Sequence, residues 1–226
     1  MAAKRDSQPA THGERSPRRA GNGRRDPERT RESILRSAVD EFARFGLGGA
    51  RVDRIAARAG ANKRMLYYYF GSKEDMFLAA LEASYASIRS AERELRLEHL
   101  APRAALERLV AFTWHYYLEH PEFLALLNSE NLHDGRHVRR SRRVRDMHSP
   151  LVGTLRHILR RGESEGVFRH GIDPVQLYIS IAGEGYFYLS NRHTLAQIFD
   201  RDLMAPRALR ARSRHITELI LNAVRR

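Results

Sequence analysis

The sequence predicts an all-α protein, and three observations support that prediction. Apolar residues recur three and four positions apart along most of the chain, as the buried side of a helix requires. Glycine, proline and helix-capping residues divide these stretches into segments of helical length. No segment alternates apolar and polar residues in the manner of a half-buried strand, and no internal repeat is present.

Residues 1–25 are predicted to form a disordered basic arm, because they are rich in Arg, Pro, Gly and Ser and have almost no large apolar side chains. The 226-residue chain has a formal net charge of +13. Residues 1–25 contain seven Lys and Arg against two acids, and residues 26–73 contain ten against six. This distribution favours a polyanionic partner near the N-terminus, with a solubilising tail as the plainer alternative.

The first helix is predicted to begin at Asp26–Pro27, with Asp as the N-cap and Pro at the first helical position. Gly46–Gly49 end it. Its apolar side comprises Ile34, Leu35, Ala38, Val39, Phe42 and Phe45. A short second helix follows, with an apolar side made of Val52, Ile55, Ala56 and Ala59.

Gly60 is predicted to stop the second helix and Asn62 to cap a third, which carries Leu66 and Phe70 four positions apart. Gly71 closes that helix. Ser72 then caps a fourth helix, with Asp75 at its third position. Two short helices joined by a glycine-containing turn, behind a longer first helix, describe a helix-turn-helix over residues 26–73.

The third helix contains three consecutive tyrosines behind a Lys-Arg pair, in the segment ANKRMLYYYF at residues 61–70. On a helical wheel Tyr67 and Tyr68 lie off the side that carries Leu66 and Phe70, and Tyr69 lies between. A tyrosine can rest its ring on the edge of a core while its hydroxyl reaches a phosphate oxygen. The alternative is a tyrosine-rich packing surface without a ligand.

Residues 31–77 resemble the N-terminal DNA-binding domain of tetracycline-repressor-type regulators, the TetR family. The resemblance extends over about 47 residues, and the rest of the chain diverges widely in that family. The matching elements are Ile34-Leu35, Ala38, Phe42, Gly46, Val52, Ile55-Ala56, Ala59-Gly60, Leu66-Tyr67, Phe70 and Ser72-Lys73-Glu74.

The resemblance implies a homodimer on a double-stranded DNA operator, with each third helix in a major groove. It implies that Lys63, Arg64 and Met65 face base edges, and that Tyr67, Tyr68 and Tyr69 meet phosphates or thymine methyl groups. Lys73 would meet a phosphate at the start of the fourth helix, where the helix dipole helps. Arg64 has the chemistry to bind guanine through two hydrogen bonds.

Two positions depart from the family pattern. The second helix commonly begins with Thr or Ser, but this chain has Ala50-Arg51-Val52, so Arg51 is expected to supply the phosphate contact in place of the missing cap. Asn62 replaces the usual Ser at the start of the third helix and caps equally well.

The chain from residue 74 to residue 226 is predicted to be a helical effector-binding and dimerisation domain. Helices are expected over about 73–98, 103–119, 121–133, 174–191 and 206–225. A further long helix is expected between residues 133 and 174. It ends near Gly162–Gly166 and carries on one side Val144, Met147, Leu151, Leu155 and Ile158. The arginine-rich segment 134–146 is interpreted as a solvated connector, with DNA phosphate contact as the alternative.

By the same resemblance, the last two helices of each chain are expected to form the dimer interface, and a small organic effector is expected between the middle helices. Its candidate contacts are Trp114, His115, Tyr117, Phe123, Leu127, Asn131, Tyr178 and Tyr186. Glu184, within an apolar helix, would either bind a ligand or bridge to an Arg across the interface, and we favour the bridge.

Several function classes are not expected. The sequence has no apolar stretch long enough for a membrane span, no secretory signal and no cysteine, which fits a reducing cytoplasm. No nucleophile–base motif, glycine-rich phosphate loop or carboxylate pair indicates an enzyme, and no cofactor is expected. Glu130 and His133 are suitably spaced for a metal, but they lack a third ligand.

The favoured hypothesis is therefore a transcriptional regulator, most often a repressor in this family, that an effector releases from a palindromic operator. The alternative is a weakly sequence-specific architectural DNA-binding protein driven by the basic arm.

Overall fold

The computed structural model describes residues 27–226, apart from the side chains of residues 148 and 149, and the predicted arm lies outside this range. The elements are α1 (Pro27–Gly49), α2 (Val52–Ala59), α3 (Lys63–Phe70), α4 (Lys73–Glu94), η1 (Leu97–His99), α5 (Pro102–Glu119), α6 (Pro121–Asn131), η2 (Val138–Arg140), α7 (Arg142–Ser164), α8 (Pro174–Ser190), α9 (Arg192–Phe199) and α10 (Pro206–Val224). The fold class is therefore confirmed as all-α within the described residues.

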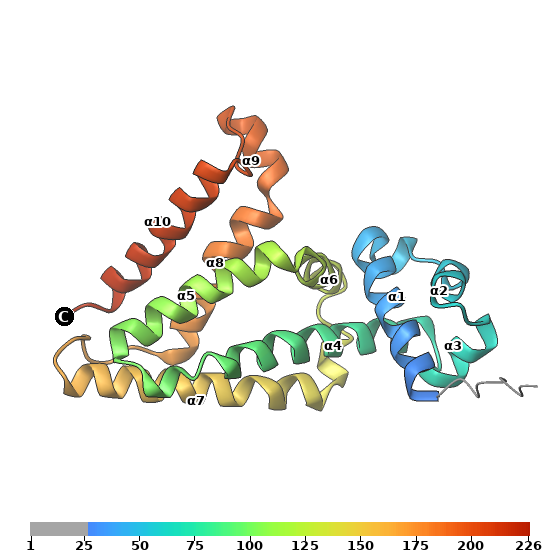
Figure 1. The fold of residues 1–226 in the computed structure, drawn as a ribbon, viewed down its shortest axis with the longest axis horizontal. Coiled ribbons are helices and arrows are strands. Elements are labelled where there is room, and N and C mark those ends of the chain that lie inside the picture. Colours follow the sequence, from blue (N-terminus) through green and yellow to red (C-terminus); the bar gives the residue numbers. More distant parts are fainter. Residues whose placement is uncertain (1–26) are drawn as a thin grey trace, which may run out of the picture.

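The chain forms two lobes that α4 joins (Figure 1). The smaller lobe contains α1, α2 and α3, and α4 runs from it into the larger lobe, where α7 lies alongside it. Met76 and Phe77 of α4 belong to the core of the smaller lobe, whereas Ile88 belongs to the core of the larger lobe. One continuous helix thus links the two cores.

The core of the smaller lobe agrees with the predicted apolar sides of the first three helices. Ile34, Ala38 and Phe42 of α1 are fully buried, and the Phe42 ring meets Phe77 edge-on at 5.2 Å between centroids. Each fully buried side chain of this size contributes about 1.5–3 kcal/mol to folding. Phe45 was expected on the same side but is 47% exposed, and the Arg54 guanidinium lies over its ring.

Helix α6 lies between the lobes and packs against both. Leu126 belongs to the smaller core, whereas Phe123 and Leu124 belong to the larger one. The contact with α1 includes a buried hydrogen bond from the Leu47 N–H to Ser129 Oγ, at 3.1 Å. It forms where the helical path of α1 is interrupted at Gly46, which has φ +62°.

Two helix boundaries and one whole helix differ from the sequence-based expectation. α4 ends at Glu94 rather than near residue 98, because Arg96 turns the chain at φ 47° and Leu97 becomes buried in η1. α7 begins inside the expected connector, since Ser141 Oγ accepts the Val144 N–H at 3.1 Å and so caps the helix. α9 was not predicted, although Leu195, Ile198 and Phe199 have helical spacing, and none of its residues is buried.

No helix among residues 27–226 combines the length and the apolar content that a bilayer span requires. The described residues contain one isolated antiparallel bridge, between Phe168 and Arg225.

Candidate nucleic-acid interface

The turn between α2 and α3 occupies residues 60–62 and has the predicted chemistry. Gly60 adopts φ 61° and ψ 31°, a left-handed conformation that glycine adopts without strain. The Ala61 N–H bonds to the Ala56 carbonyl at 3.0 Å. Asn62 Oδ1 accepts the Met65 N–H at 2.9 Å, which confirms Asn62 as the cap of α3.

Helix α3 turns one side to the core and the opposite side to solvent. Leu66 is fully buried, whereas Tyr67 is 42% exposed and Tyr68 is 82% exposed. Lys63 and Arg64 are exposed one turn earlier, so the same outward side carries two cations and two phenols. We call Lys63, Arg64, Tyr67 and Tyr68 the α3 surface.

Met65 and Tyr69 lie at the edge of the α3 surface rather than on it. Both are half-buried and pack against the smaller core. The Tyr68 and Tyr69 rings also meet edge-on, at 5.2 Å between centroids. The tyrosine run therefore divides between the two roles considered from the sequence: Tyr69 packs, and Tyr67 and Tyr68 face outward.

Lys63 is already paired within the chain. Its Nζ lies 3.0 Å from Asp53 Oδ1 of α2. The hydrogen bond with Asp53 and the charge of that carboxylate raise the pKa of Lys63 above its ordinary value. The ammonium group therefore stays charged and is held beside the start of α3.

Glu41 of α1 organises α2, and sequence reasoning missed it. The carboxylate is fully buried and accepts Arg54 Nε at 2.6 Å and the backbone N–H of Arg51 at 3.0 Å. Arg58 Nη2 lies 3.5 Å away. Burial raises the pKa of Glu41, but the hydrogen bonds from Arg54 and Arg51 outweigh burial, and the net shift is downward.

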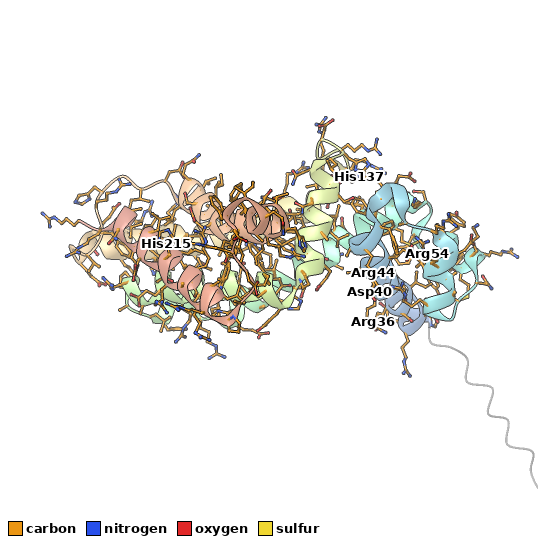
Figure 2. All side chains as sticks on the ribbon, turned by 90° about the horizontal axis from the view of Figure 1, so that it is seen from above. Arg36, Asp40, Arg44, Arg54, His137 and His215 are labelled. Atoms are coloured by element: carbon orange, nitrogen blue, oxygen red, sulfur yellow. The ribbon has the colours of Figure 1, made fainter. Side chains whose placement is uncertain are left out.

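The contact between Glu41 and the Arg51 backbone explains how α2 begins without the Thr or Ser cap that is common in the family. Arg51 occupies the N-cap position of α2 and offers no side-chain cap, as expected. Glu41 instead holds its backbone, and the Arg51 side chain is left exposed at the start of the helix. Figure 2 shows Arg54 beside α2, and Arg36, Asp40 and Arg44 along α1. The signal available in the sequence was that Glu41 lies seven positions after Ile34 and three after Ala38, on the apolar side of α1.

The start of α4 lies directly after α3 and is fixed by polar contacts. Ser72 Oγ accepts the Asp75 N–H at 3.0 Å, and its hydroxyl donates to Asp75 Oδ2 at 2.6 Å. Arg140 donates to the other oxygen of the same carboxylate at 3.0 Å. Lys73, the first residue of α4, is half exposed.

The arginine-rich segment is attached to α4 in two places. Besides the Arg140–Asp75 contact, Arg143 Nη1 lies 3.5 Å from Glu82 Oε2. His137 within this segment, labelled in Figure 2, is buried. Its ring lies edge-on to Phe77 at 5.2 Å between centroids. These arginines therefore act as an intramolecular brace, which favours the connector interpretation.

The candidate effector residues do not all gather in one place. Trp114, Tyr117 and Phe123 are buried, and the last two stack at 5.9 Å between ring centroids as part of the larger core. Leu127 and Tyr178 pack against the same core. Tyr186 does so too, and its hydroxyl bonds to Asn128 of α6. His115 and Asn131 are exposed, and each bonds a carbonyl of its own helix.

A hollow of about 600 Å³ lies elsewhere, between α4, η1 and α7. Arg89 and Glu92 reach it from α4, and both are buried. Sequence reasoning missed this pair, although two opposite charges three positions apart in an amphipathic helix were a visible signal. A buried charged group without a full set of partners costs more than the roughly 1–3 kcal/mol of an uncharged group.

Glu130 and His133 do not face a common point. Glu130 accepts hydrogen bonds from the backbone N–H groups of His137 and Val138, at 2.8 and 2.9 Å, and lies 2.6 Å from His137 Nδ1. His133 Nδ1 bonds the Ser129 carbonyl at 2.7 Å. Among the described residues, no cluster of three or more acids and histidines could hold a metal.

The sides of α8 and α10 that face away from the larger core expose apolar residues. Ile179 is 53% exposed, Phe187 is 59% exposed and Leu219 is 43% exposed. Glu184 does pair with an arginine, but with Arg212 of the same chain, at 2.5 Å. This pair joins α8 and α10 within one chain, and the expected bridge across an interface stays a prediction.

Comparisons with known proteins agree with this arrangement. The family described as "Bacterial regulatory proteins, tetR family" matches residues 34–80, and "Tetracyclin repressor-like, C-terminal domain" matches residues 102–220. The "HTH-type transcriptional repressor NicS" of Pseudomonas putida is 44% identical over 209 residues, covering 92% of this chain and 99% of the relative. A repressor of Streptomyces coelicolor, SCO4008, is 39% identical over 49% of this chain and 54% of its own length.

Solved structures share the fold at low sequence identity. A transcriptional regulator of Streptomyces coelicolor, SCO4942, superposes with a TM-score of 0.65 at 22% identity, covering 86% of this chain and 98% of its own. The regulator FadR of Bacillus subtilis, solved with stearoyl-CoA, superposes with a TM-score of 0.62 at 17% identity, covering 85% of this chain and 98% of its own. Since both a family match over more than half of the chain and a full-length relative are found, the chain belongs to the tetR family of bacterial regulatory proteins.

Proposed function

We propose that this DNA-binding regulator is a homodimeric transcriptional repressor. Each chain would place its α3 surface in a major groove of a palindromic operator, and a small effector in the larger lobe would release the dimer. The exposed side of α3 supports this proposal most directly, because it offers Lys63, Arg64, Tyr67 and Tyr68 on a helix whose other side is anchored in a core. The proposed place of action is the cytoplasm, where the protein would meet DNA.

The contacts of each residue suggest its role on DNA. Arg64, exposed at the start of α3, would read a base, while Tyr67 and Tyr68 would meet the backbone or a thymine methyl group. Arg51 and Lys73 stand at the starts of α2 and α4, where backbone N–H groups also favour a phosphate. Asn62 would act through its cap, and Met65 from the edge of the α3 surface.

Dimerisation through α8 and α10 is supported by the apolar residues that these helices expose. A dimer would present two α3 surfaces to successive major grooves, about 34–36 Å apart along the duplex. Binding at both half-sites is what would make a palindrome the preferred target.

The coupling between effector and DNA is proposed to run through α4 and α6. Helix α6 bonds to α8 through Tyr186 and Asn128, and to α1 through Ser129 and Leu47. Helix α4 carries Arg89 at one end and meets α3 at the other. An effector that prefers one arrangement of these helices would shift the population away from the DNA-binding form.

The test is binding of the full chain to the DNA that flanks its own gene, measured by fluorescence anisotropy at several salt concentrations. Specific binding is expected to weaken with salt. Arg64→Ala is expected to lower affinity for the specific site by about 1–3 kcal/mol. Lys73→Ala is expected to weaken binding to all sequences and to reduce the salt slope by about one.

Arg108→Ala is the control, since Arg108 is exposed on α5, away from the smaller lobe. Unchanged binding by the Arg64, Tyr67 and Lys73 alanine variants would contradict the proposal. The architectural alternative predicts instead that removal of residues 1–25 abolishes binding and that sequence preference is slight.

A further inference from the structure

The hollow between α4 and α7 has the size and lining of a small-molecule site. Its volume of about 600 Å³ is within the usual range for bound organic molecules. Leu97, Met147 and Leu151 provide apolar walls, and Arg89 and Glu92 provide a charged pair. Gly153 leaves open space, because a Cβ added there would meet no atom within 4 Å.

Arg89 is buried and only partly bonded. Its residue exposure is 3%, and its Nη2 donates to the Tyr178 hydroxyl at 3.0 Å. Among the described residues, Nε and Nη1 have no hydrogen-bond partner. Nη1 lies 2.8 Å from Glu92 Oε2, but the two atoms are not aligned for a hydrogen bond, and Oε2 is also without a partner. Two donors of the guanidinium therefore lack a hydrogen-bond partner, and both are themselves buried.

The charge balance at this place favours an anion. The guanidinium is permanently charged, whereas burial raises the pKa of Glu92 to about 7, so its carboxylate is easily neutralised. The exposed rim carries Arg93 and Glu98, whose charges offset each other. A cation entering the hollow would be repelled by the Arg89 guanidinium, and a neutralised Glu92 carboxyl would not offset that repulsion.

The kind of anion follows from the same surroundings. Arg89 and Glu92 lie in the last two turns of α4, and Leu151 and Gly153 lie in the middle of α7, so neither helix points its N-terminus into the hollow. A single buried guanidinium suits one negative charge, and the apolar walls suit an apolar body. These features fit a monocarboxylate better than a phosphate ester, which needs more donors.

We propose that the hollow binds the effector and that the effector is a small organic monocarboxylate. Its carboxylate would take the place of the Glu92 carboxylate against Arg89. This inference rests on the proposed function, since it names the ligand class of an effector-responsive repressor. Ligand binding would act on α4, which leads to α3, and on Tyr178 of α8, which leads to the proposed dimer contact.

The experiment measures the binding of matched acids and amides to the full chain by calorimetry and thermal shift. The probes are benzoate, 2-naphthoate and octanoate, the primary amide of each, and phenylphosphonate. At least one carboxylate is expected to bind more than tenfold tighter than its amide. Arg89→Met is expected to abolish that preference, and Gly153→Leu is expected to weaken binding by filling the hollow while leaving Arg89 in place.

Arg108→Met is the matched control, because it removes an exposed arginine of the larger lobe. Its acid preference should equal that of the unmodified protein, and circular dichroism verifies the fold of each variant. Equal binding of acids and amides, binding of phenylphosphonate alone, or undiminished acid binding by both Arg89→Met and Gly153→Leu would overturn the inference.

Operator binding is measured separately for each protein without any probe. A wild-type chain that binds its operator but no carboxylate would leave the proposed function standing and overturn the ligand class. A chain that binds carboxylates through Arg89 but no DNA would refute the proposed function while the ligand site stands.

Discussion

At the scale of single residues, the buried carboxylate of Glu41 decides how the DNA-binding lobe is held together. It gathers Arg54, Arg58 and the backbone of Arg51 around one point on α1. Because the net pKa shift of Glu41 is downward, its stabilising effect is present above the ordinary carboxyl pKa and is lost as the pH falls through the lowered value.

Glu41→Gln is expected to lower the free energy of unfolding by roughly 1–3 kcal/mol at neutral pH, because two arginines lose a buried partner. The loss should shrink in acid, where the wild-type carboxylate is itself protonated. Urea unfolding at pH 7 and pH 3 measures both effects. Glu32→Gln is the control, as Glu32 makes an exposed pair with Arg36, and it should change stability by at most about 0.5 kcal/mol.

Glu92 behaves in the opposite sense. Burial raises its pKa to about 7, so between the ordinary carboxyl pKa and pH 7 the folded chain holds a proton that the unfolded chain has released. The contribution of Glu92 to stability therefore falls as the pH rises through this interval, by at most ~1.4 kcal/mol per pH unit for one proton.

Glu92→Gln is expected to remove that fall. The free energy of unfolding of the variant, relative to wild type, should rise between pH 5 and pH 7 and level off above it. Both proteins contain the same histidines, so the difference between their free energies of unfolding excludes the contribution of histidine titration. Parallel curves for both proteins across this range would rule out a raised pKa at Glu92.

At the scale of elements, α7 ends against Phe168 in a way that only glycine allows. A Cβ on Gly162 would lie 2.0 Å from the Phe168 ring, and that ring is 2% exposed. The bridge from Phe168 to Arg225 brings the C-terminal end of α10 to the same place. The turn after α7 and the last helix are thus secured by one aromatic side chain.

Gly162→Ala is expected to lower the free energy of unfolding by roughly 1–3 kcal/mol, because the ring must be displaced from a packed core. Gly153→Ala in the same helix should do the reverse and raise it by up to ~1 kcal/mol, since alanine is the better helix former and nothing obstructs it. Thermal unfolding of both variants measures these two changes in stability. A stabilised Gly162→Ala variant would contradict this account.

Elements with a strong local signal could be predicted from the sequence. The Asn62 cap, the Gly60 turn and the Ser72 cap depend on adjacent residues, and all three are confirmed. The eight-residue α9 was missed although Leu195, Ile198 and Phe199 have helical spacing, because so short a segment gives little more than one repeat of the pattern. The start of α7 was hidden because the Ser141 cap lies within a run of arginines.

The candidate sites follow the same division. The outward side of α3 could be derived from a helical wheel, since it depends on spacing alone. The roles of Glu41 and Arg89 depend on partners distant in sequence, and the hollow depends on how α4 and α7 approach each other. Such arrangements arise from tertiary packing, which a local pattern does not encode.

At the scale of the whole molecule, the two lobes have different apolar exposure. In the larger lobe, α8, α9, the turn after α9 and α10 expose large apolar side chains. These are Val175, Ile179, Phe187, Ile198, Phe199, Met204 and Leu219. These exposed side chains support the proposed dimer contact, because large exposed apolar surface favours association. Helices α8, α9 and α10 lie in the lobe of the molecule away from α3 (Figure 1).

Ile179→Asp combined with Phe187→Asp is expected to convert the proposed dimer to monomers, weakening self-association by more than about 100-fold, because a charge would be buried without a partner. The single chain should still fold, since both side chains are exposed in it. Leu132→Asp is the control, as Leu132 is 85% exposed on the connection after α6. Sedimentation measures all three proteins. A wild-type monomer at micromolar concentration would exclude the dimer.

The ion pair between Lys63 and Asp53 has a consequence for target selection. A nucleic acid that approaches α3 does not find a vacant cation, because the ammonium group already has an acceptor 3.0 Å away. In the proposed complex, an acceptor on the DNA near Lys63 competes with Asp53 for the ammonium group. Both side chains of this pair are exposed, so the pair is weak, and Lys63 contributes somewhat less to binding than an unpaired lysine would.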